Sequence, residues 1–334
     1  MHWREENSTR LCATTLAGLI AIGAGGVKTD SVHAAELAKG RESGSEAEAQ
    51  SPPTSDQAQR KQAASADSAR EGTKRRLDEE RRRLSEEAAT TGNDPTAIVG
   101  YYQASYGHSQ YTGGLSTNFA QAQVRLPLTP NWFVQFTLPY LWADLNRDAA
   151  SFSANGTGNM VIRTGGRIYR DEYVQLAVGL DGTFPTASDS RLGSSQYTLG
   201  PGVAAAVPLP RVQSLAYLVV SDYNSVGGDP KLAEIHFMQI EPRLNTYWTE
   251  HWWTLLDGRW LMDWNNRRKT TLNLIGVLGY RFDEHWNVFA GAAGGLVGQD
   301  TFLGLDWGVQ LGVRWVFDAP LIPEKLFSAP FGNP

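Results

Sequence analysis

The feature that most constrains this chain is a strict alternation of side chains close to its C-terminal end. Residues 303–317 read LGLDWGVQLGVRWVF, with a large apolar side chain at every odd position and mainly Gly, Asp, Gln or Arg between them. Successive side chains of a β-strand point to opposite faces, so this pattern predicts a strand with one apolar and one polar face. The 15-residue run is longer than the roughly 9 to 11 tilted residues that cross a bilayer. We therefore predict a transmembrane β-strand.

The composition is compatible with membrane-spanning strands and excludes membrane-spanning helices. The chain of 334 residues is 19% charged and contains 11 Trp, 12 Tyr, 12 Phe and 34 Gly. After the N-terminal region, no stretch supplies the roughly 20 consecutive apolar residues that a transmembrane helix needs. A transmembrane barrel escapes average hydropathy, because only alternate residues face lipid.

The N-terminal region indicates export across the inner membrane. Arg4 and Arg10 precede or flank an apolar run over residues 11–26, and Val32-His33-Ala34 offers a small-x-small cleavage site. This organisation predicts a signal peptide over residues 1–34. The single cysteine, Cys12, lies inside it, so we expect the mature chain to have neither a disulfide nor a lipid anchor.

Residues 35–94 change character and predict a charged periplasmic linker. Ser, Ala, Gln, Pro and charged residues dominate there, and such a composition cannot bury a core. Within residues 57–90, Asp78 precedes Arg82 by four residues, a spacing that supports an exposed helix. The preferred interpretation is a solvated tether; the alternative is a short coiled coil that contacts a second copy or the cell wall. Carboxylates interleave the arginines, which argues against nucleic-acid binding.

The alternation recurs throughout residues 95–318 and predicts the fold class, all-β. Examples are AQAQVRLPL (120–128), NMVIRTGGRIY (159–169), YVQLAVGLDGTF (173–184) and HWWTLLDGRWLMDW (251–264). Such runs number about twelve, which predicts a transmembrane antiparallel up-and-down β-barrel, with ten or fourteen strands as the alternatives. We expect it in the bacterial outer membrane, in contact with outer-membrane lipids and, during insertion, with the barrel-assembly machinery. Residues 319–334 would form a periplasmic tail.

The connections support this topology. Five short segments with polar turn residues each join an even strand to the next odd one, at 128–132, 169–173, 208–212, 248–252 and 282–286. Four links of the other kind are longer and rich in Ser, Gly, Asn and Asp, at 107–117, 146–158, 186–195 and 224–231. Short periplasmic turns and long external loops are typical of outer-membrane barrels.

Two of these segments carry a family resemblance. GTGNMVIRTGGRIY (156–169), followed by GLDGTFPTASDSRLGSSQYTLGPGVAAAV (179–207), resembles the outer-membrane family of phenol-degradation meta-pathway proteins, which are described as transporters. The matching residues are Gly156, Gly158, Pro185, Thr186, Gly193, Ser194, Gly200 and Gly202. The resemblance implies a barrel associated with hydrophobic or aromatic compounds. The charged N-terminal extension and the tail after Phe317 depart from it.

The expected lumen contains charges of both signs. The strand pattern directs the following side chains inward as the candidate substrate path: Arg125, Arg163, Arg167, Asp181, Glu241, Arg243, Asp257, Arg259, Asp263, Asp306 and Arg314. Eight strands leave a filled interior and sixteen an aqueous channel, so about twelve are intermediate. One hypothesis is an outer-membrane channel or transporter for small hydrophobic or aromatic solutes. The alternative is a structural or adhesive barrel with a periplasmic tether, whose lumen charges only stabilise the wall.

An enzyme is the least favoured hypothesis. A lipid hydrolase on such a barrel needs a nucleophile, a base and an orienting group within hydrogen-bond reach. The mature chain offers His108, His236, His251 and His285. Ser109 follows His108 directly, but adjacency in sequence is not a base–nucleophile geometry, and no serine accompanies His236 at a recognisable spacing. We therefore predict no catalytic residues. The sequence also shows neither zinc-ligand spacing nor a phosphate-binding loop, so we expect no cofactor and no metal.

Overall fold

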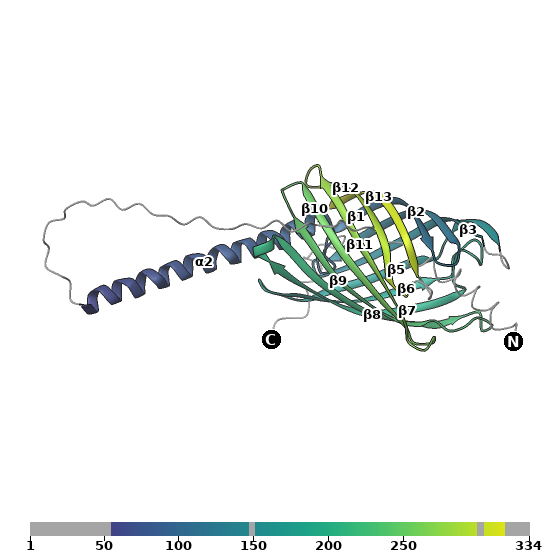
Figure 1. Ribbon diagram of the computed structural model, residues 1–334, viewed down its shortest axis with the longest axis horizontal. Helices are drawn as coiled ribbons and strands as arrows, with labels where there is room; N and C mark the ends of the chain where they lie inside the picture. Colours follow the sequence, from purple (N-terminus) through teal and green to yellow (C-terminus); the bar gives the residue numbers. More distant parts are fainter. Residues whose placement is uncertain (1–54, 147–150, 299–303, 318–334) are drawn as a thin grey trace, which may run out of the picture. The chain divides into compact units, whose positions relative to one another are not determined.

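In a computed structural model, the structure describes residues 55–146, 151–298 and 304–317. The predicted signal peptide over residues 1–34 and the predicted tail over residues 319–334 lie outside the described residues. The described part is an antiparallel β-barrel preceded by one long helix (Figure 1). None of the described helices is long and apolar enough to cross a membrane.

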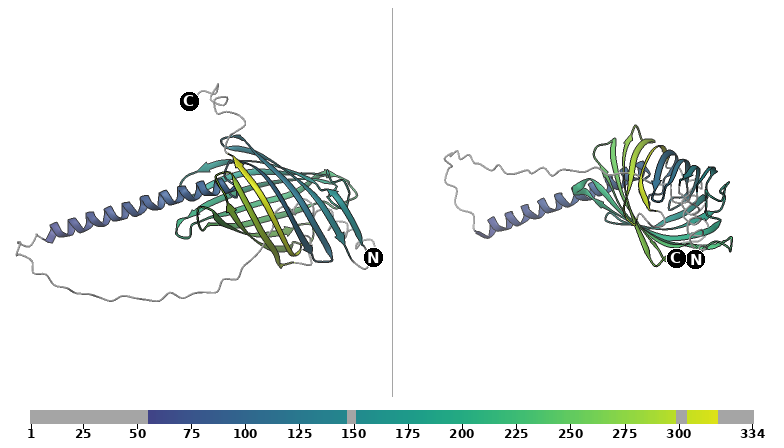
Figure 2. Two further views of the ribbon diagram at one scale, coloured as in Figure 1. Left: turned by 90° about the horizontal axis from the view of Figure 1, so that it is seen from above. Right: turned by 45° about the vertical axis from the view of Figure 1, so that its right-hand side comes forward.

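The barrel wall is built from consecutive antiparallel strands, which Figure 2 shows tilted around a common interior. Their bounds are β1 (Gly100–Tyr111), β2 (Leu115–Thr129), β3 (Trp132–Leu145), β4 (Phe152–Thr157), β5 (Met160–Arg170), β6 (Gln175–Phe184), β7 (Gln196–Leu209), β8 (Ser214–Gly228), β9 (His236–Tyr247), β10 (Trp252–Asp263), β11 (Lys269–Arg281), β12 (Trp286–Val297) and β13 (Leu305–Phe317). Strand β1 pairs with both β2 and β13, and β2 pairs with β3, so the sheet closes on itself.

The predicted number of twelve strands is confirmed, although one strand is broken. β4 pairs with the second half of β3, where Tyr140 lies opposite Thr157, and β5 pairs with its first half, where Thr137 lies opposite Val161. The two segments therefore occupy one position in the wall, interrupted at Gly158 and Asn159. The Asn159 side chain is fully buried and donates to Ser194 Oγ at 2.9 Å, so the β6–β7 loop holds the break.

The five short connections occur where the sequence predicts them, and side chains explain their tightness. Asp171 Oδ1 accepts hydrogen bonds from the backbone N–H of Tyr173 and Val174, each at 2.7 Å. Asp283 Oδ1 makes the same arrangement with His285 and Trp286, each at 2.8 Å. An Asp side chain that satisfies the next backbone donors fixes a turn locally. A short 3₁₀ turn, η1 (Pro210–Val212), makes the link from β7 to β8.

The prediction of a long external loop at 107–117 is wrong. β1 and β2 continue to Tyr111 and Leu115 in register, which leaves a connection of residues 112–114. Gly113 and Gly114 make this tight link with φ of 92° and 85°. Residues with a Cβ rarely adopt such angles, and a Cβ on Gly114 would also meet the carbonyl oxygen of Asn146.

The outer face of the wall is apolar. Exposed side chains of β3, for example, are Trp132, Phe136, Leu138, Tyr140 and Trp142. Aromatic side chains also gather beside the short turns, where Tyr173, Trp248, Trp252, Phe282 and Trp286 are exposed. An outward apolar band with aromatic girdles is the surface that a lipid bilayer requires of a barrel.

The C-terminal strand β13 deviates at its start from the predicted alternation. Trp307, Val309, Leu311 and Val313 face outward as predicted. Leu305, however, is buried, because the pairing of β1 with β13 slips so that Gln110 lies opposite Trp307 and Tyr111 opposite Leu305. The irregularity turns Leu305 inward and leaves Asp306 exposed at the rim.

The helix α2 (Ser55–Thr91) extends over the whole of residues 57–90, within which the sequence predicts a helix. Up to Glu80 it belongs to a separate unit of the chain, and there Arg75 and Glu71 form an exposed ion pair at 2.7 Å. From Arg81 onward the helix is part of the barrel unit. Its side chains Leu84 and Ala88 are fully buried in the same apolar cluster as wall residues.

Candidate functional site

A layer of charged side chains lies inside the barrel. Eight of the eleven predicted lumen residues belong to it, and we call Arg125, Arg163, Asp181, Glu241, Arg243, Asp257, Arg259 and Arg314 the charged layer. They come from β2, β5, β6, β9, β10 and β13, at positions where alternation turns them away from the apolar outer face.

One pair in this layer is a bidentate ion pair between neighbouring strands. Arg163 and Asp181 lie opposite each other in the β5–β6 register. Nε and Nη2 of Arg163 donate to the two carboxylate oxygens of Asp181 at 2.6 and 2.7 Å. The Tyr223 hydroxyl donates to the same carboxylate at 2.7 Å. The planar guanidinium fits a carboxylate in this fork geometry, so both charges are satisfied without external partners.

The second group, on β9 and β10, joins two arginines and two carboxylates. Asp257 is completely buried and lies opposite Arg243 in the β9–β10 register. Its carboxylate oxygens lie 3.2 Å from Arg243 Nε and 3.2 Å from Arg259 Nη2. Arg243 also pairs with Glu241. Buried charges are stable only when they are paired, so this group supports the wall.

Arg125 and Arg314 differ, because neither forms an ion pair with a carboxylate among the described residues. Arg125 Nε donates to Gln135 Oε1 at 3.0 Å, and Arg314 Nε donates to Gln103 Oε1 at 2.8 Å. The guanidinium carbon of each lies 4.9 Å from the centroid of the Tyr101 ring. The Tyr101 hydroxyl donates to Gln135 at 2.8 Å. Two cations thus share one aromatic ring and neutral amide partners.

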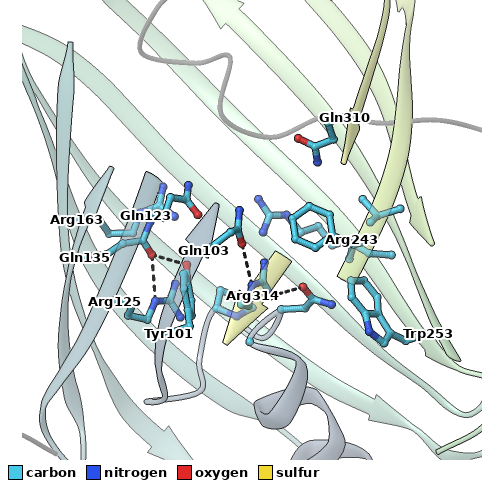
Figure 3. Close-up of a pocket in the computed structure, with 16 residues that line it drawn as sticks. Tyr101, Gln103, Gln123, Arg125, Gln135, Arg163, Arg243, Trp253, Gln310 and Arg314 are labelled. Carbon is cyan, nitrogen blue, oxygen red and sulfur yellow. Dashed lines mark hydrogen bonds between the residues drawn. The ribbon is translucent and has the colours of Figure 1, made fainter. Parts of the chain in front are cut away.

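These two arginines line an interior cavity of about 100 Å³ (Figure 3). Its polar wall is formed by Gln103, Gln123, Arg125, Gln135, Arg163, Arg243, Gln310 and Arg314, and its apolar wall includes Tyr101, Trp253, Leu255, Val277 and Phe289. Tyr101, Gln103 and Gln135 are not among the residues that the sequence predicts to line the lumen. The alternation of Tyr101, Gln103 and Ser105 with outward Tyr102 and Tyr106 was the available signal, in a strand whose pattern is less clear than the others.

Three predicted lumen residues lie outside the charged layer. Arg167 is close to a short turn, where it donates to Asn131 Oδ1 at 3.3 Å. Asp263 ends β10 and accepts from the backbone N–H of Asn265 at 3.0 Å. Asp306 lies at the rim and accepts from the Thr112 hydroxyl at 2.6 Å. Arg167 and Asp263 lie near the ends of their strands, where side chains no longer alternate regularly between the two faces. Asp306 lies at the irregularity in the pairing of β13.

Residues 81–99 close the end of the barrel at which the short turns lie, and we call them the plug. Nη1 of Arg281 donates to Thr90 Oγ1 at 2.5 Å, and Nδ2 of Asn287 donates to the Thr90 carbonyl at 3.3 Å. Nη1 of Arg314 donates to the Thr91 carbonyl and, at 2.8 Å, to Asn93 Oδ1. Gln175 donates to Ser85 at 3.1 Å. The plug also supplies Gly92, Asn93 and Pro95 to the cavity.

One acidic side chain of the plug is deeply buried. Asp94 is 1% exposed, and its Oδ1 accepts from the backbone N–H and the hydroxyl of Thr96 at 2.7 and 2.6 Å. Burial raises the pKa of Asp94 above its ordinary value, although these hydrogen bonds and the nearby Arg125 and Arg167 act in the opposite direction.

The opposite end of the barrel interior is filled by apolar side chains, which we call the apolar cluster: Leu115, Phe119, Leu141, Leu192, Ile235, Phe237, Leu261 and Leu305. Most belong to the wall, whereas Leu192 comes from the β6–β7 loop and is 1% exposed. The cavity therefore lies between the plug and the apolar cluster.

The histidines considered for catalysis have structural partners. His251 Nδ1 lies 2.8 Å from the Arg281 carbonyl, and His285 Nδ1 lies 2.9 Å from the Val316 carbonyl. His108 Nδ1 lies 3.0 Å from Asn118 Oδ1. His236 Nε2 lies 3.4 Å from Asp222, beside the Trp264 ring. No hydrogen bond joins any of them to a serine hydroxyl within the described ranges, and none of the described His, Cys, Asp and Glu residues gather in threes as metal ligands would.

The sequence matches no family model and no curated protein. Solved structures with a related barrel include the NanC porin, at 12% identity over 64% of this chain and 98% of that one, with a TM-score of 0.47. The translocator domain of the autotransporter NalP from Neisseria meningitidis aligns at 13% identity over 73% of this chain and 97% of its own, with a TM-score of 0.41. Outer membrane phospholipase A from Escherichia coli aligns at 14% identity over 67% and 93%, with a TM-score of 0.35. The likeness concerns the barrel alone and does not confirm the resemblance to phenol-degradation meta-pathway proteins.

Proposed function

We propose that the protein is an outer-membrane channel for small hydrophobic or aromatic solutes, closed at rest by its own plug. The observation that carries the proposal is the cavity inside a closed barrel whose outer face is apolar. A barrel with such an outer face is stable in a bilayer, where outer-membrane lipids would surround it. A polar cavity enclosed by the wall then provides the middle of a path across the membrane.

The lining of the interior supports solutes with an apolar body. Tyr101, Trp253 and Phe289 present aromatic surface to the cavity, and the apolar cluster lies beyond it. A small planar molecule could exchange water for these surfaces, which favours its entry by the hydrophobic effect. The charged layer would keep the passage narrow, because its paired side chains fill the wall side of the lumen.

The first experiment measures single-channel conductance of the refolded full chain in a planar bilayer. We expect rare, brief openings for the wild-type chain, since the plug must leave before ions pass. Leu84→Ala removes a fully buried side chain from the plug, which typically costs about 2–5 kcal/mol of packing free energy. Openings should therefore become frequent in this variant.

Arg82→Ala is the matched control, because Arg82 is exposed on the same helical turn. It should leave the opening frequency unchanged. Heat-shifted mobility on a gel verifies that each barrel is folded. Silence of folded wild-type and Leu84→Ala chains, together with unchanged uptake of aromatic solutes by cells that lack the protein, would contradict a channel.

A structural barrel is the second candidate, and closure of the interior at both ends favours it. In that case the plug and the apolar cluster would be permanent, and contacts of residues 57–90 with the cell wall or a second copy would matter most. Crosslinking from that segment together with a silent bilayer would support this candidate.

A further inference from the structure

The charged layer contains more positive than negative groups. Five arginines, at 125, 163, 243, 259 and 314, face three carboxylates, at 181, 241 and 257. Arg163, Arg243 and Arg259 are engaged with these carboxylates in the ion pairs described above. The excess charge therefore resides on Arg125 and Arg314. Asp94 of the plug is a further acid close to Arg125, and its burial disfavours the charged form.

From this excess charge we propose that the cavity is a binding site for a small aromatic carboxylate, recognised by Arg125 and Arg314. The proposal rests on the proposed channel function and deepens it, since it gives the solute a charge as well as an apolar body.

Arg125 presents an unsatisfied donor. It is 5% exposed, and its Nη1 has no hydrogen-bond partner among the described residues. A buried donor without an acceptor is unfavourable, and more so when it is charged. Carboxylate oxygens are the acceptors that match a guanidinium best. Its present neighbours, the Gln135 amide and the rings of Tyr101 and Phe133, leave the charge uncompensated.

Arg314 provides a second cation on the other side of the Tyr101 ring (Figure 3). Its acceptors are neutral: Gln103 Oε1, Asn93 Oδ1 and the Thr91 carbonyl. Both arginines line the same cavity, so one anion placed there would interact with both. The attraction is strong in this setting because the interior has a lower dielectric constant than water.

The remaining lining selects the body of the ligand. Trp253, Phe289, Leu255 and Val277 form an apolar wall beside the cations. The cavity of about 100 Å³ has space for several water molecules, since one water needs roughly 10–15 Å³ on the same measure. That space suits an acid with a single ring, whose flat faces would contact the aromatic side chains.

The test uses the refolded full chain in detergent at low salt and measures calorimetric binding of three probes. Benzoate carries both features, benzamide keeps the ring without the charge, and acetate keeps the charge without the ring. We expect benzoate to bind at least about tenfold more tightly than either analogue. Equal affinity for benzamide would overturn the carboxylate site, and equal affinity for acetate would overturn the aromatic assignment.

Two variants place the binding at the arginines. Arg125→Gln should weaken benzoate binding about tenfold or more, whereas Arg211→Gln, in the exposed η1 turn, should leave it unchanged. Gln135→Glu is a second variant, for the case that Arg125→Gln does not fold. It preserves the shape of the side chain and places an internal carboxylate beside Arg125 Nε. It should also abolish the preference for benzoate over benzamide. Unchanged benzoate affinity in folded Arg125→Gln or in folded Gln135→Glu would overturn the proposal.

Failure of this proposal and failure of the channel are distinguishable. Conductance without preference for benzoate would remove the carboxylate site and leave the channel. Benzoate binding to a barrel that never conducts would keep the site and remove the channel.

Discussion

The two ends of the barrel interior are closed in different ways. At the short-turn end, a separate stretch of chain enters, and arginine and amide side chains of the wall donate hydrogen bonds to Thr90, Thr91 and Asn93. At the other end, wall side chains such as Phe119, Leu141 and Phe237 pack against one another. The plug also buries Leu84 and Ala88 among apolar side chains, so its attachment is mixed.

The two closures differ in whether they can open while the barrel wall stays folded. The plug is attached to the wall by side-chain contacts and by the chain leading into β1, so it can leave by local undocking, which costs less than global unfolding. The wall members of the apolar cluster cannot leave, because their backbones form the ladder of the barrel. Leu192 differs from them, because it comes from the β6–β7 loop, which could move without breaking strand pairing.

The largest expected effect comes from Phe119, which is 2% exposed and belongs to the apolar cluster. Phe119→Ala should lower the free energy of unfolding by about 3–5 kcal/mol, because a core aromatic leaves a cavity that the wall fills only partly. Urea unfolding followed by heat-shifted gel mobility measures the change. Opening frequency in a bilayer should stay near the wild-type value, since the plug keeps its polar contacts.

The control for Phe119 is Phe136, which is 39% exposed on the outer face of the neighbouring strand. Phe136→Ala should have a much smaller effect in detergent. Frequent opening of Phe119→Ala with unchanged stability would show that the apolar end is the gate and would reverse the comparison.

The next effect concerns the plug alone. Thr90→Val keeps the shape of the side chain but removes the acceptor of Arg281 Nη1. A hydrogen bond to a charged group contributes about 1.5–3 kcal/mol, so docking of the plug should weaken by that amount while the wall is unaffected. We expect this variant to open more often in a bilayer and to resist urea as well as the wild type does. A loss of urea resistance equal to that of Phe119→Ala would mean that plug and wall unfold as one unit.

Much of the wall could be predicted from sequence, because a two-residue period has only one structural meaning. The number of strands, the five short turns and the inward direction of residues such as Arg163 and Asp257 follow from alternation and turn chemistry. The prediction failed at strand ends. Nothing in the alternation distinguishes the paired residues 107–111 from a loop, and a slip in pairing at Asp306 is invisible in a single strand.

The contents of the interior were harder to predict. Alternation assigns Arg125 and Arg163 to the same face, but it does not show that Arg163 has a carboxylate opposite it whereas Arg125 has only Gln135. That distinction depends on the register between strands. The plug was also missed, because Leu84 and Ala88 are too few to indicate a buried helix face in a segment dominated by charged residues.

A smaller effect should depend on pH. The pKa of Asp94 is raised by burial, so the docked plug binds a proton more readily than the undocked plug. Docking is then strongest below the ordinary pKa of an Asp, and it weakens as the pH rises through the raised pKa. We expect openings to become more frequent over that rise, measured as open time against pH. Asp94→Asn should remove the dependence; if it persists there, another group is responsible.

The smallest expected effect tests whether a turn of the wall at the plugged end influences the plug. Thr249 Oγ1 accepts from the backbone N–H of His251 at 3.2 Å and of Trp252 at 3.0 Å, in the turn that follows Tyr247. Tyr247 in turn approaches the plug residue Thr91. Thr249→Ala should reduce urea resistance by at most about 1 kcal/mol, because water replaces the lost partner of two exposed donors. Thr249→Ser keeps the hydroxyl and should behave as wild type. If the Ala variant also opens more often, the turn positions the plug through Tyr247, and wall and plug are then coupled at that end.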